Sequence, residues 1–199
     1  TKKMTKIDES NQLKNDEFFW ETSDYNWSPD SKWICYSFVQ YNRNSQIYVY
    51  SLEQNKKYAV TNDFFDNLYP CFDKNGDYLY YVSNRNFDIL MDFFEDNHVI
   101  RTPQTVMAVQ LKGGEKPPFI EPAGSDDKKK GSGLVQIDID GLQKRTYPLP
   151  VPAGNYFHLK AGKGKVAWCA VDHFTEAEYE EIFKPGGASK WQVMMYDMT

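Results

Sequence analysis

A short polar turn set between alternating large apolar residues occurs twice in this sequence, 45 positions apart. The first copy is Trp27 to Tyr36 and the second is Phe72 to Tyr81. In the first copy Pro29 presets the backbone angle of the turn, while Asp30 and Ser31 can bond to nearby backbone groups, so the chain reverses at little cost. A repeat of about 45 residues is typical of the four-stranded blades of a β-propeller.

Three other segments of alternating residues resemble one another, and each ends in a polar turn. They are Gln46 to Leu52, Val135 to Asp140 and Gln192 to Asp197. Alternation of this kind is typical of strands with one buried face. We therefore predict an all-β chain, a partial β-propeller of TolB-like or WD40-like four-stranded meander blades with loop insertions and one short helix.

The repeat also predicts how the chain is divided. We expect an N-terminal lead-in arm over residues 1–26 and a propeller segment over residues 27–199. Within that segment the blade-like units are residues 27–67, residues 68–149 with insertions at 84–104 and 112–133, and an incomplete unit at 150–199.

Local signals predict a hairpin and a helix in the second half of the chain. The Asp140-Gly141 pair between Val135 to Ile139 and Arg145 to Leu149 is a hairpin signal. The helix is predicted at Thr175 to Phe183, where Thr175 can cap the N-terminus and Glu178 stands at the capping-box position. The insertion at 112–133 is rich in Gly, Pro, Lys and Asp, which predicts a mobile loop.

Composition excludes several classes of partner. The net charge is −5, the pI is about 5.3 and no long basic run occurs, so we expect no nucleic acid partner. No apolar run approaches the roughly 20 residues that span a bilayer, and no apolar stretch follows the polar N-terminus. We expect neither a membrane span nor a signal peptide in this sequence, which starts at Thr1 and resembles a piece of something longer. The compartment stays open between cytoplasm and periplasm.

No residue of the chain is predicted to be catalytic, to bind a cofactor or to hold a metal. Cys35, Cys71 and Cys169 lie in apolar strand patterns without metal-ligand spacing, so we interpret them as buried small hydrophobic residues. The sequence has no Gly-x-Ser-x-Gly elbow, and Ser132 lies in the predicted mobile loop. The histidines are His98, His158 and His173. His158 falls in a predicted strand and is interpreted as a packed or edge residue rather than a base.

Two acidic segments have both a functional and a structural interpretation. Asp73 to Asp77 has oxygen-bearing residues at alternate positions, but Gly76 and the following residues do not fit a calcium loop, which favours a hairpin turn. Asp138 and Asp140 would share one strand face, either as a paired acid site or, as we favour, as solvated residues or partners in hydrogen bonds between blades.

Aromatic residues offer a similar choice. A set of tyrosines and a tryptophan could form a stacking platform, but propeller blades bury large side chains between sheets, which favours core packing. The set is Trp33, Tyr36, Tyr78, Tyr80 and Tyr81. The mixed acidic and aromatic stretch from Asp88 to His98 is the best candidate for a recognition loop, with a lid or a contact between domains as the alternatives.

Three segments resemble the tricorn protease family, and the resemblance covers roughly Trp27 to Asp197. The segments are Thr105 to Phe119, Ile137 to Arg145 running into Pro148 to Tyr156, and the turn at Trp27 to Asp30. The Asp-Gly to Pro-Val-Pro-Ala-Gly-Asn-Tyr segment is the most selective of them, since many TolB-like propellers carry the turn.

The resemblance implies a place within a large serine peptidase of the S41 type. Such proteins have two propellers, a helical domain, a PDZ domain and a catalytic core, and the matched segments are similar to the second propeller, whose channel guides peptides. The catalytic Ser, His and Glu of the family have no counterparts here. The implied function is that of a non-catalytic propeller segment guiding or gating peptide access to a catalytic domain outside this chain.

Two other functions stay open at this stage. One is a TolB-like module that binds a protein or glycan without peptidase activity, and the other is the gating propeller of a prolyl-oligopeptidase-like enzyme. If the chain is a propeller segment of a tricorn-like peptidase, its partners are peptides or unfolded proteins and the remaining domains of the parent protein. A second copy of the chain is a further candidate partner, because the sheet edges of a partial propeller need cover.

Overall fold

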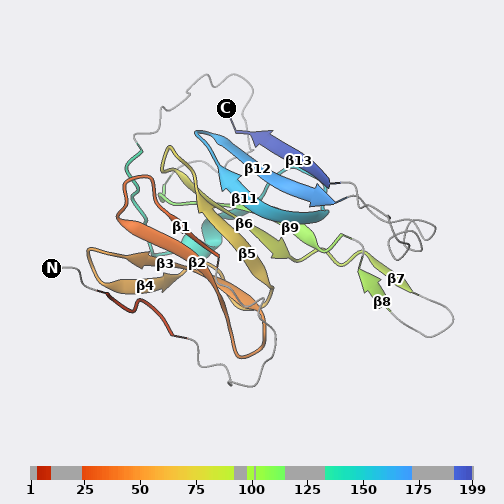
Figure 1. Cartoon of the computed structure of the whole chain (residues 1–199), viewed down its shortest axis with the longest axis horizontal. Coiled ribbons are helices and arrows are strands. Elements are labelled where there is room, and N and C mark those ends of the chain that lie inside the picture. Colours follow the sequence, from red (N-terminus) through yellow and green to blue (C-terminus); the bar gives the residue numbers. More distant parts are fainter. Residues whose placement is uncertain are drawn as a thin grey trace.

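The computed structural model describes residues 4–9, 24–91, 98–100, 102–114, 133–171 and 191–198. Three antiparallel sheets follow one another in chain order, and a separate two-stranded sheet stands apart from them (Figure 1). The prediction of an all-β, propeller-type chain is confirmed, and the three sheets do not close into a ring. The predicted helix, Ser132 and His173 lie outside the described residues.

Each large sheet is an antiparallel meander whose first strand in the chain lies at one edge of the sheet. The first sheet has the order β1 (Tyr25–Trp27), β2 (Trp33–Val39), β3 (Ser45–Ser51) and β4 (Lys56–Ala59). The second has the order β5 (Asn67–Phe72), β6 (Tyr78–Asn84), β9 (Gln104–Gln110) and β10 (Thr146–Pro148). The third has the order β11 (Asn155–Ala161), β12 (Lys165–Val171) and β13 (Trp191–Asp197). The two-stranded sheet pairs β7 (Ile89–Met91) with β8 (His98–Ile100).

The repeated turns have the predicted role of joining β1 to β2 and β5 to β6. In the first turn the Ser28 hydroxyl accepts the backbone N–H of Trp33 at 2.9 Å, and the Ser28 N–H donates to the Trp33 carbonyl at 2.9 Å. In the second turn the Asp73 N–H donates to the Tyr78 carbonyl at 2.9 Å. Residues Asp73 to Asp77 therefore form a hairpin turn, as predicted.

The carboxylates of the two turns also tie the sheets together. Asp73 is buried and accepts the backbone N–H of Gly164, between β11 and β12, at 3.0 Å. Asp30 accepts the backbone N–H of Val135 at 3.0 Å. Gly76 has φ +84, and a Cβ there would lie 2.6 Å from the Leu134 carbonyl oxygen, so a glycine is needed for this close approach.

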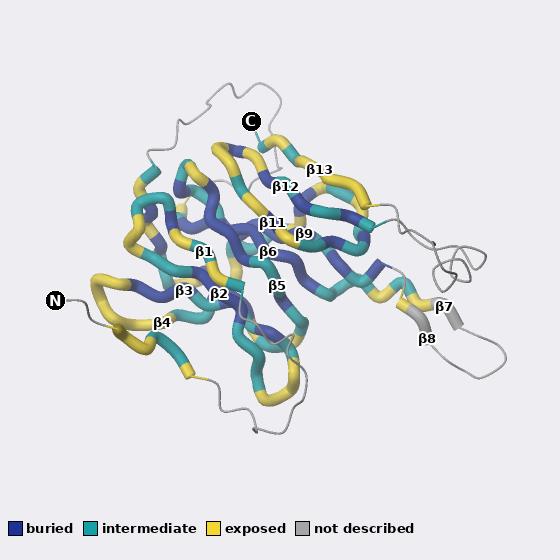
Figure 2. The backbone as a smooth tube through the Cα atoms, viewed as in Figure 1, coloured by how far each residue is buried: buried dark blue, intermediate teal, exposed yellow. Residues whose placement is uncertain are grey.

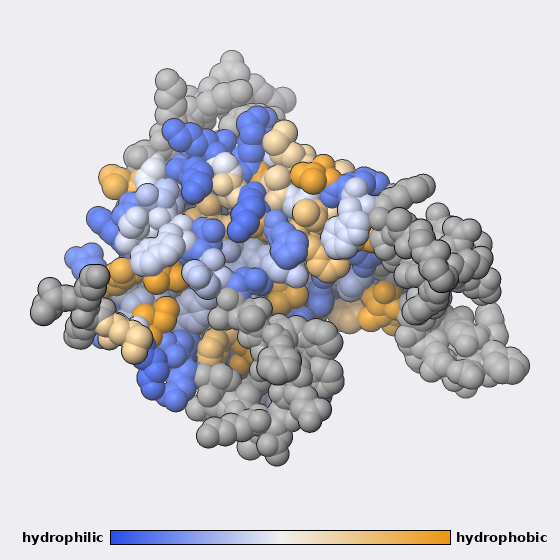
Figure 3. All heavy atoms as spheres, in the orientation of Figure 1, coloured by the Kyte–Doolittle hydropathy of each residue, from blue (hydrophilic) through white to orange (hydrophobic). Residues whose placement is uncertain are grey.

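The core consists of two apolar layers on opposite faces of the second sheet (Figure 2). Successive strand residues point to opposite faces, so Leu79 and Tyr81 of β6 face the first sheet while Tyr80 and Val82 face the third. These four residues are buried, which confirms core packing for Tyr80 and Tyr81. The outer surface is mixed, with hydrophobic side chains interspersed among hydrophilic ones on the face seen in Figure 3.

The hairpin predicted around Asp140-Gly141 is wrong. Residues 134–139 belong to no strand, and the turn leads into a short 3-10 helix, η1 (Leu142–Arg145). Val135, Ile137 and Leu142 are buried in the layer between the first and second sheets, which explains the alternating pattern. Their backbone is held by single hydrogen bonds to distant parts of the chain instead of by a strand ladder, since the Asp138 N–H donates to the Leu111 carbonyl at 3.0 Å and the Val135 N–H donates to the Asp30 carboxylate at 3.0 Å.

The Pro-Val-Pro-Ala-Gly-Asn-Tyr segment joins the second sheet to the third. The backbone of Gly154 pairs with that of Gln104 through hydrogen bonds of 3.1 and 2.9 Å. The Gln104 side-chain oxygen accepts the backbone N–H of Tyr156, whose hydroxyl donates to the Pro152 carbonyl at 2.5 Å. A Cβ on Gly154 would lie 2.5 Å from the Tyr156 ring, so this close-packed corner needs glycine.

Candidate functional site: the inner edge of the sheets

The strands β1, β5 and β11 each form an edge of their sheet and lie next to one another. In a propeller, the first strand of each blade borders the central channel. This inner edge is therefore the part of the chain that a ligand in such a channel would meet. Among the described residues no helix is long and apolar enough to cross a membrane, and no group of His, Cys, Asp and Glu could hold a metal ion.

Asp24, Tyr69 and His158 occupy equivalent positions on the inner edge. They lie three residues before the last residue of β1, β5 and β11, respectively, and Asp24 directly precedes β1. We call these three residues the inner-edge row. The strands β5 and β11 both carry a register shift here, between Leu68 and Cys71 and between Phe157 and Lys160. Tyr69 and His158 both have φ +56. A bulky residue with positive φ is uncommon and costs about 1–3 kcal/mol, so both bulges are held in place by their surroundings.

Contacts connect the three positions across the sheets. The Asp24 carboxylate accepts the backbone N–H of Tyr69 at 3.2 Å, and the Asp24 carbonyl accepts the N–H of Ser37 at 3.0 Å. The Tyr69 and His158 rings lie 5.4 Å apart between centroids, inclined by 55°. The row therefore runs from a carboxylate on the first sheet through a phenol on the second to an imidazole on the third.

The row is only partly in contact with water. Burial raises the pKa of Asp24, although the Tyr69 N–H and the charges of His158 and Lys160 oppose this. Burial also raises the pKa of Tyr69, and the nearby Asp24 and Asp66 add to the effect. His158 and Lys160 are exposed. The row thus presents a carboxylate, a phenol and an imidazole, which together can accept and donate hydrogen bonds, with the Lys160 ammonium nearby.

The sequence interpretation assigned no function to any member of the row, and it considered His158 only as a packed or edge residue. His158 is an edge residue, as expected, with its ring against Tyr69. Asp24 and Tyr69 lie 45 positions apart, the same spacing as the repeated turns, so extending the repeat by three residues would have paired them. No sequence signal marks the bulges, because the residues with positive φ there are neither Gly, Asn nor Asp.

The other candidate residues lie elsewhere. Asp138 and Asp140 do not share a strand face. The Asp138 carboxylate accepts the Gly113 N–H at 2.7 Å, which lowers its pKa, whereas Asp140 is exposed. His98 belongs to β8. The three cysteines are free; two are buried, and burial raises the pKa of Cys71 to about 12, whereas Cys169 is half-buried.

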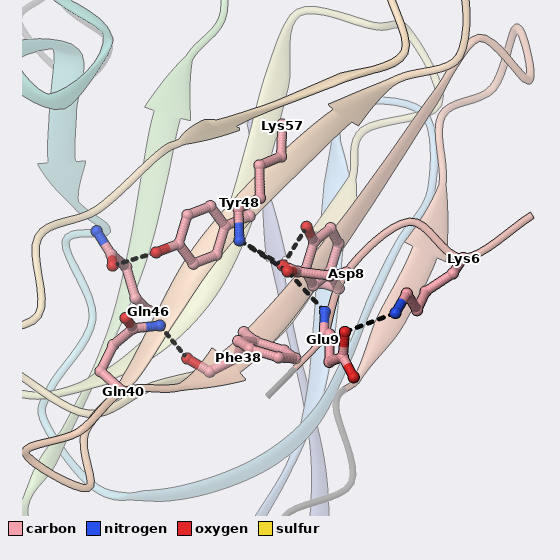
Figure 4. Close-up of polar contacts among 9 residues, drawn as sticks. Lys6, Asp8, Glu9, Phe38, Gln40, Gln46, Tyr48 and Lys57 are labelled. Carbon is pink, nitrogen blue, oxygen red and sulfur yellow. Dashed lines mark hydrogen bonds and ion pairs between the residues drawn. The ribbon is translucent and has the colours of Figure 1, made fainter. Parts of the chain in front are cut away.

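A recess lies on the outer face of the first sheet, where the N-terminal residues 4–9 cross it. Its volume is about 340 Å³. It is lined by Ile7, Asp8, Tyr25, Trp27, Ile34, Tyr36 and Phe38. The Asp8 carboxylate accepts the Tyr36 hydroxyl at 2.8 Å. It also lies 2.7 Å from the Lys57 ammonium, as Figure 4 shows. With this carboxylate already bonded, the recess offers mainly aromatic and aliphatic surface. The sequence predicted only a lead-in arm here and no binding surface.

Known proteins resemble this chain over much of its length. The tricorn protease of Thermoplasma volcanium is 30% identical over 139 residues, which are 67% of this chain and 13% of that protein. The tricorn protease homolog of Saccharolobus solfataricus is 26% identical over 143 residues, 70% of this chain and 12% of that protein. The chain therefore spans only a small fraction of the length of the curated relatives it matches.

Solved structures share the fold. The crystal structure of the tricorn protease has a TM-score of 0.67 at 23% identity and covers 88% of this chain and 17% of that one. The putative TolB from Agrobacterium tumefaciens has a TM-score of 0.53 at 14% identity and covers 89% of this chain and 46% of that one. The family described as the tricorn protease second beta propeller domain matches residues 1–199. This chain therefore belongs to the tricorn protease second β-propeller domain family.

Proposed function

We propose that this chain is a non-catalytic propeller segment of a tricorn-like serine protease that guides or gates peptides on their way to a catalytic domain elsewhere in the parent protein. Membership of the family over the whole chain supports the first part. The observation that supports the guiding role is the inner-edge row, because its carboxylate, phenol and imidazole lie in sequence along the edge that would border the channel of a closed propeller.

The chemistry of the row suits an extended peptide. Every peptide unit carries one N–H donor and one carbonyl acceptor, so a passing chain can exchange hydrogen bonds with a carboxylate, a phenol and an imidazole whatever its sequence. The rings of Tyr69 and His158 add an apolar surface beside these groups. Weak contacts of this kind would orient a peptide without retaining it.

The test uses the intact parent protein with two substrates, a fluorogenic tripeptide and a peptide of about 15 residues. Tyr69→Gly and His158→Gly together remove both side chains, and glycine suits the positive φ at these positions. We expect kcat/KM for the long peptide to change by about fivefold or more, equivalent to roughly 1 kcal/mol, while kcat/KM for the tripeptide stays the same.

Arg43→Gly is the matched control, because Arg43 also has positive φ, is exposed and lies in the turn between β2 and β3. It should change neither rate. Equal effects of the double substitution on both substrates would contradict a guiding role, and so would no effect on either. Hydrolysis of neither peptide by the intact unsubstituted protein would contradict the peptidase assignment itself.

A further inference from the structure

The side chain of Arg85 is held in one orientation by two buried hydroxyl groups. Arg85 follows directly after β6, where the chain leaves the second sheet toward β7 (Figure 1). Its Nε atom donates to the Ser83 hydroxyl at 2.9 Å, and its Nη2 atom donates to the Tyr81 hydroxyl at 3.4 Å. Ser83 and Tyr81 are both buried, whereas Arg85 is half-buried. Because a free arginine side chain has many rotamers, these two contacts pre-organise its guanidinium at the surface.

The other edge of this guanidinium has donors to spare. A guanidinium has five N–H donors, and Arg85 uses one at Nε and one at Nη2. Three remain on Nη1 and Nη2, side by side at the end of the group. Among the described residues no carboxylate pairs with Arg85, although the sequence contains 28 Asp and Glu residues. The Asp66 carboxylate, next to Phe65 in the chain, instead accepts the Ser45 N–H at 2.9 Å and the Asn84 side-chain amide at 3.1 Å.

Aromatic rings adjoin the guanidinium. Its central carbon lies 5.0 Å from the centre of the Phe65 ring, which is a cation–π contact. The Phe65 ring in turn lies 6.4 Å from the Phe87 ring, inclined by 43°. Phe87 is 62% exposed. A ligand that reached the Nη atoms of Arg85 would therefore meet apolar surface beside its charged group.

The donors indicate the chemical class of the ligand. A carboxylate has one negative charge and two acceptor oxygens, which match two parallel N–H groups of a single guanidinium. A phosphate group carries up to about two charges and is usually recognised by a cluster of arginines. We propose that Arg85, Phe65 and Phe87 form a binding site for a peptide carboxylate with an apolar side chain beside it, supplied by the chain terminus or by an acidic side chain. The proposal does not depend on the guiding role of the inner-edge row.

The test is an NMR titration of the isotope-labelled 199-residue chain, followed at the backbone and guanidinium resonances of Arg85. The probe is a short acetylated peptide of Gly and Ser that ends in Leu with a free carboxylate. One comparison peptide has the same sequence with a C-terminal amide, and another is amidated and has Glu before the Leu. The three peptides share the apolar side chain and differ in whether and where they carry a carboxylate.

We expect the Kd of the free-carboxylate peptide to be at least about tenfold lower than that of the first amidated peptide. Arg85→Gln should raise the Kd of the free-carboxylate peptide about tenfold or more. Arg85→Lys should raise it less, because an ammonium keeps the charge and lacks the paired N–H groups. The matched control is Arg43→Gln, at an exposed arginine in the turn between β2 and β3, and should leave the Kd unchanged.

Phe87→Ser tests the apolar part of the site. It should raise the Kd of the free-carboxylate peptide about threefold or more, because the leucine side chain loses its contact surface. Tyr41→Ser, at an aromatic residue that is also exposed, is the control and should have no effect.

The Glu peptide identifies the source of the carboxylate. Binding as tight as that of the free-carboxylate peptide supports an acidic side chain, and binding about tenfold weaker supports the chain terminus. Equal Kd values for the free-carboxylate peptide and its amide would overturn the proposal, and this comparison needs no substituted protein. An unchanged Kd in Arg85→Gln would also overturn it, as would displacement of the peptide by inorganic phosphate at a lower concentration than by acetate.

Discussion

At the scale of single residues, the carboxylates of the repeated turns hold neighbouring parts of the fold together. Asp30 accepts hydrogen bonds from the Ser28 hydroxyl at 2.7 Å, the Lys32 N–H at 3.2 Å and the Val135 N–H at 3.0 Å. Burial alone would raise the pKa of Asp30, but these donors outweigh it and lower the pKa. The charged carboxylate is therefore bound more strongly in the folded chain than in the unfolded one.

Replacing Asp30 with Asn should lower the free energy of unfolding at neutral pH by about 1 kcal/mol, because the amide keeps one acceptor oxygen and loses the charge. Since the folded pKa lies below 3.8, the contribution of Asp30 is present above that pH and is lost as the pH falls through the folded pKa. The difference between the two proteins should shrink in that range. Urea unfolding between pH 7 and pH 2.5 measures this, with Asp140→Asn as the control at an exposed carboxylate.

At the scale of elements, Arg145 holds the segment from 133 to 145 in place. Its guanidinium donates to the carbonyls of Gln110 at 3.1 Å, Leu111 at 3.3 Å and Asp140 at 2.8 Å, and also to that of Asp138. A planar group with five N–H donors can serve four carbonyls at once, and an ammonium cannot. This one side chain takes over the role that a strand ladder would have had.

We expect Arg145→Lys to destabilise the chain by about 1–3 kcal/mol, since several carbonyls would lose their donor. Amide hydrogen exchange at Asp138, whose N–H donates to Leu111, should accelerate together with that of its neighbours. The matched control is Lys144→Ala, at the adjacent exposed position in η1. If Arg145→Lys and Lys144→Ala had equal effects, the carbonyl contacts would not be holding the segment.

The elements that the sequence predicted well are those specified by local physics. The turns at Pro29 and Gly76 depend on backbone preferences of a few adjacent residues, and their repeat at blade spacing is enough to predict the propeller type. The segment from Val135 to Ile139 shows the limit of this reasoning. The alternation of apolar and polar residues in this segment shows which side chains are buried. A segment buried between two sheets has the same pattern even though its backbone forms no strand hydrogen bonds.

The candidate site was harder to predict because it is made by packing between elements. The left-handed conformations of Tyr69 and His158 contradict the local preferences of both residues, so only contacts from neighbouring strands can impose them. Asp24 joins the row through a hydrogen bond to a residue on another sheet. None of these contacts can be predicted from a short stretch of neighbouring residues, although the 45-residue repeat could have aligned Asp24 with Tyr69.

At the scale of the whole molecule, the stack of three sheets leaves an apolar face open at its end. Trp191, Val193 and Met195 alternate along β13, share one face and are 63%, 79% and 62% exposed. The middle sheet, by contrast, is covered on both faces by the two apolar layers. An apolar sheet face needs a second layer against it, so the 199-residue chain should associate with further copies of itself through β13.

Sedimentation velocity over a range of protein concentrations tests this. The unsubstituted chain should sediment faster as its concentration rises, and Val193→Thr with Met195→Thr should shift this change to at least tenfold higher concentration. Threonine keeps the β-propensity of the strand while removing apolar surface. Leu52→Thr, at an exposed apolar residue in the turn after β3, should leave the association unchanged. A monomer at all concentrations would mean that the β13 face is stable when exposed to water. Association that is unchanged by the β13 substitutions would mean that the contact lies on another surface of the molecule.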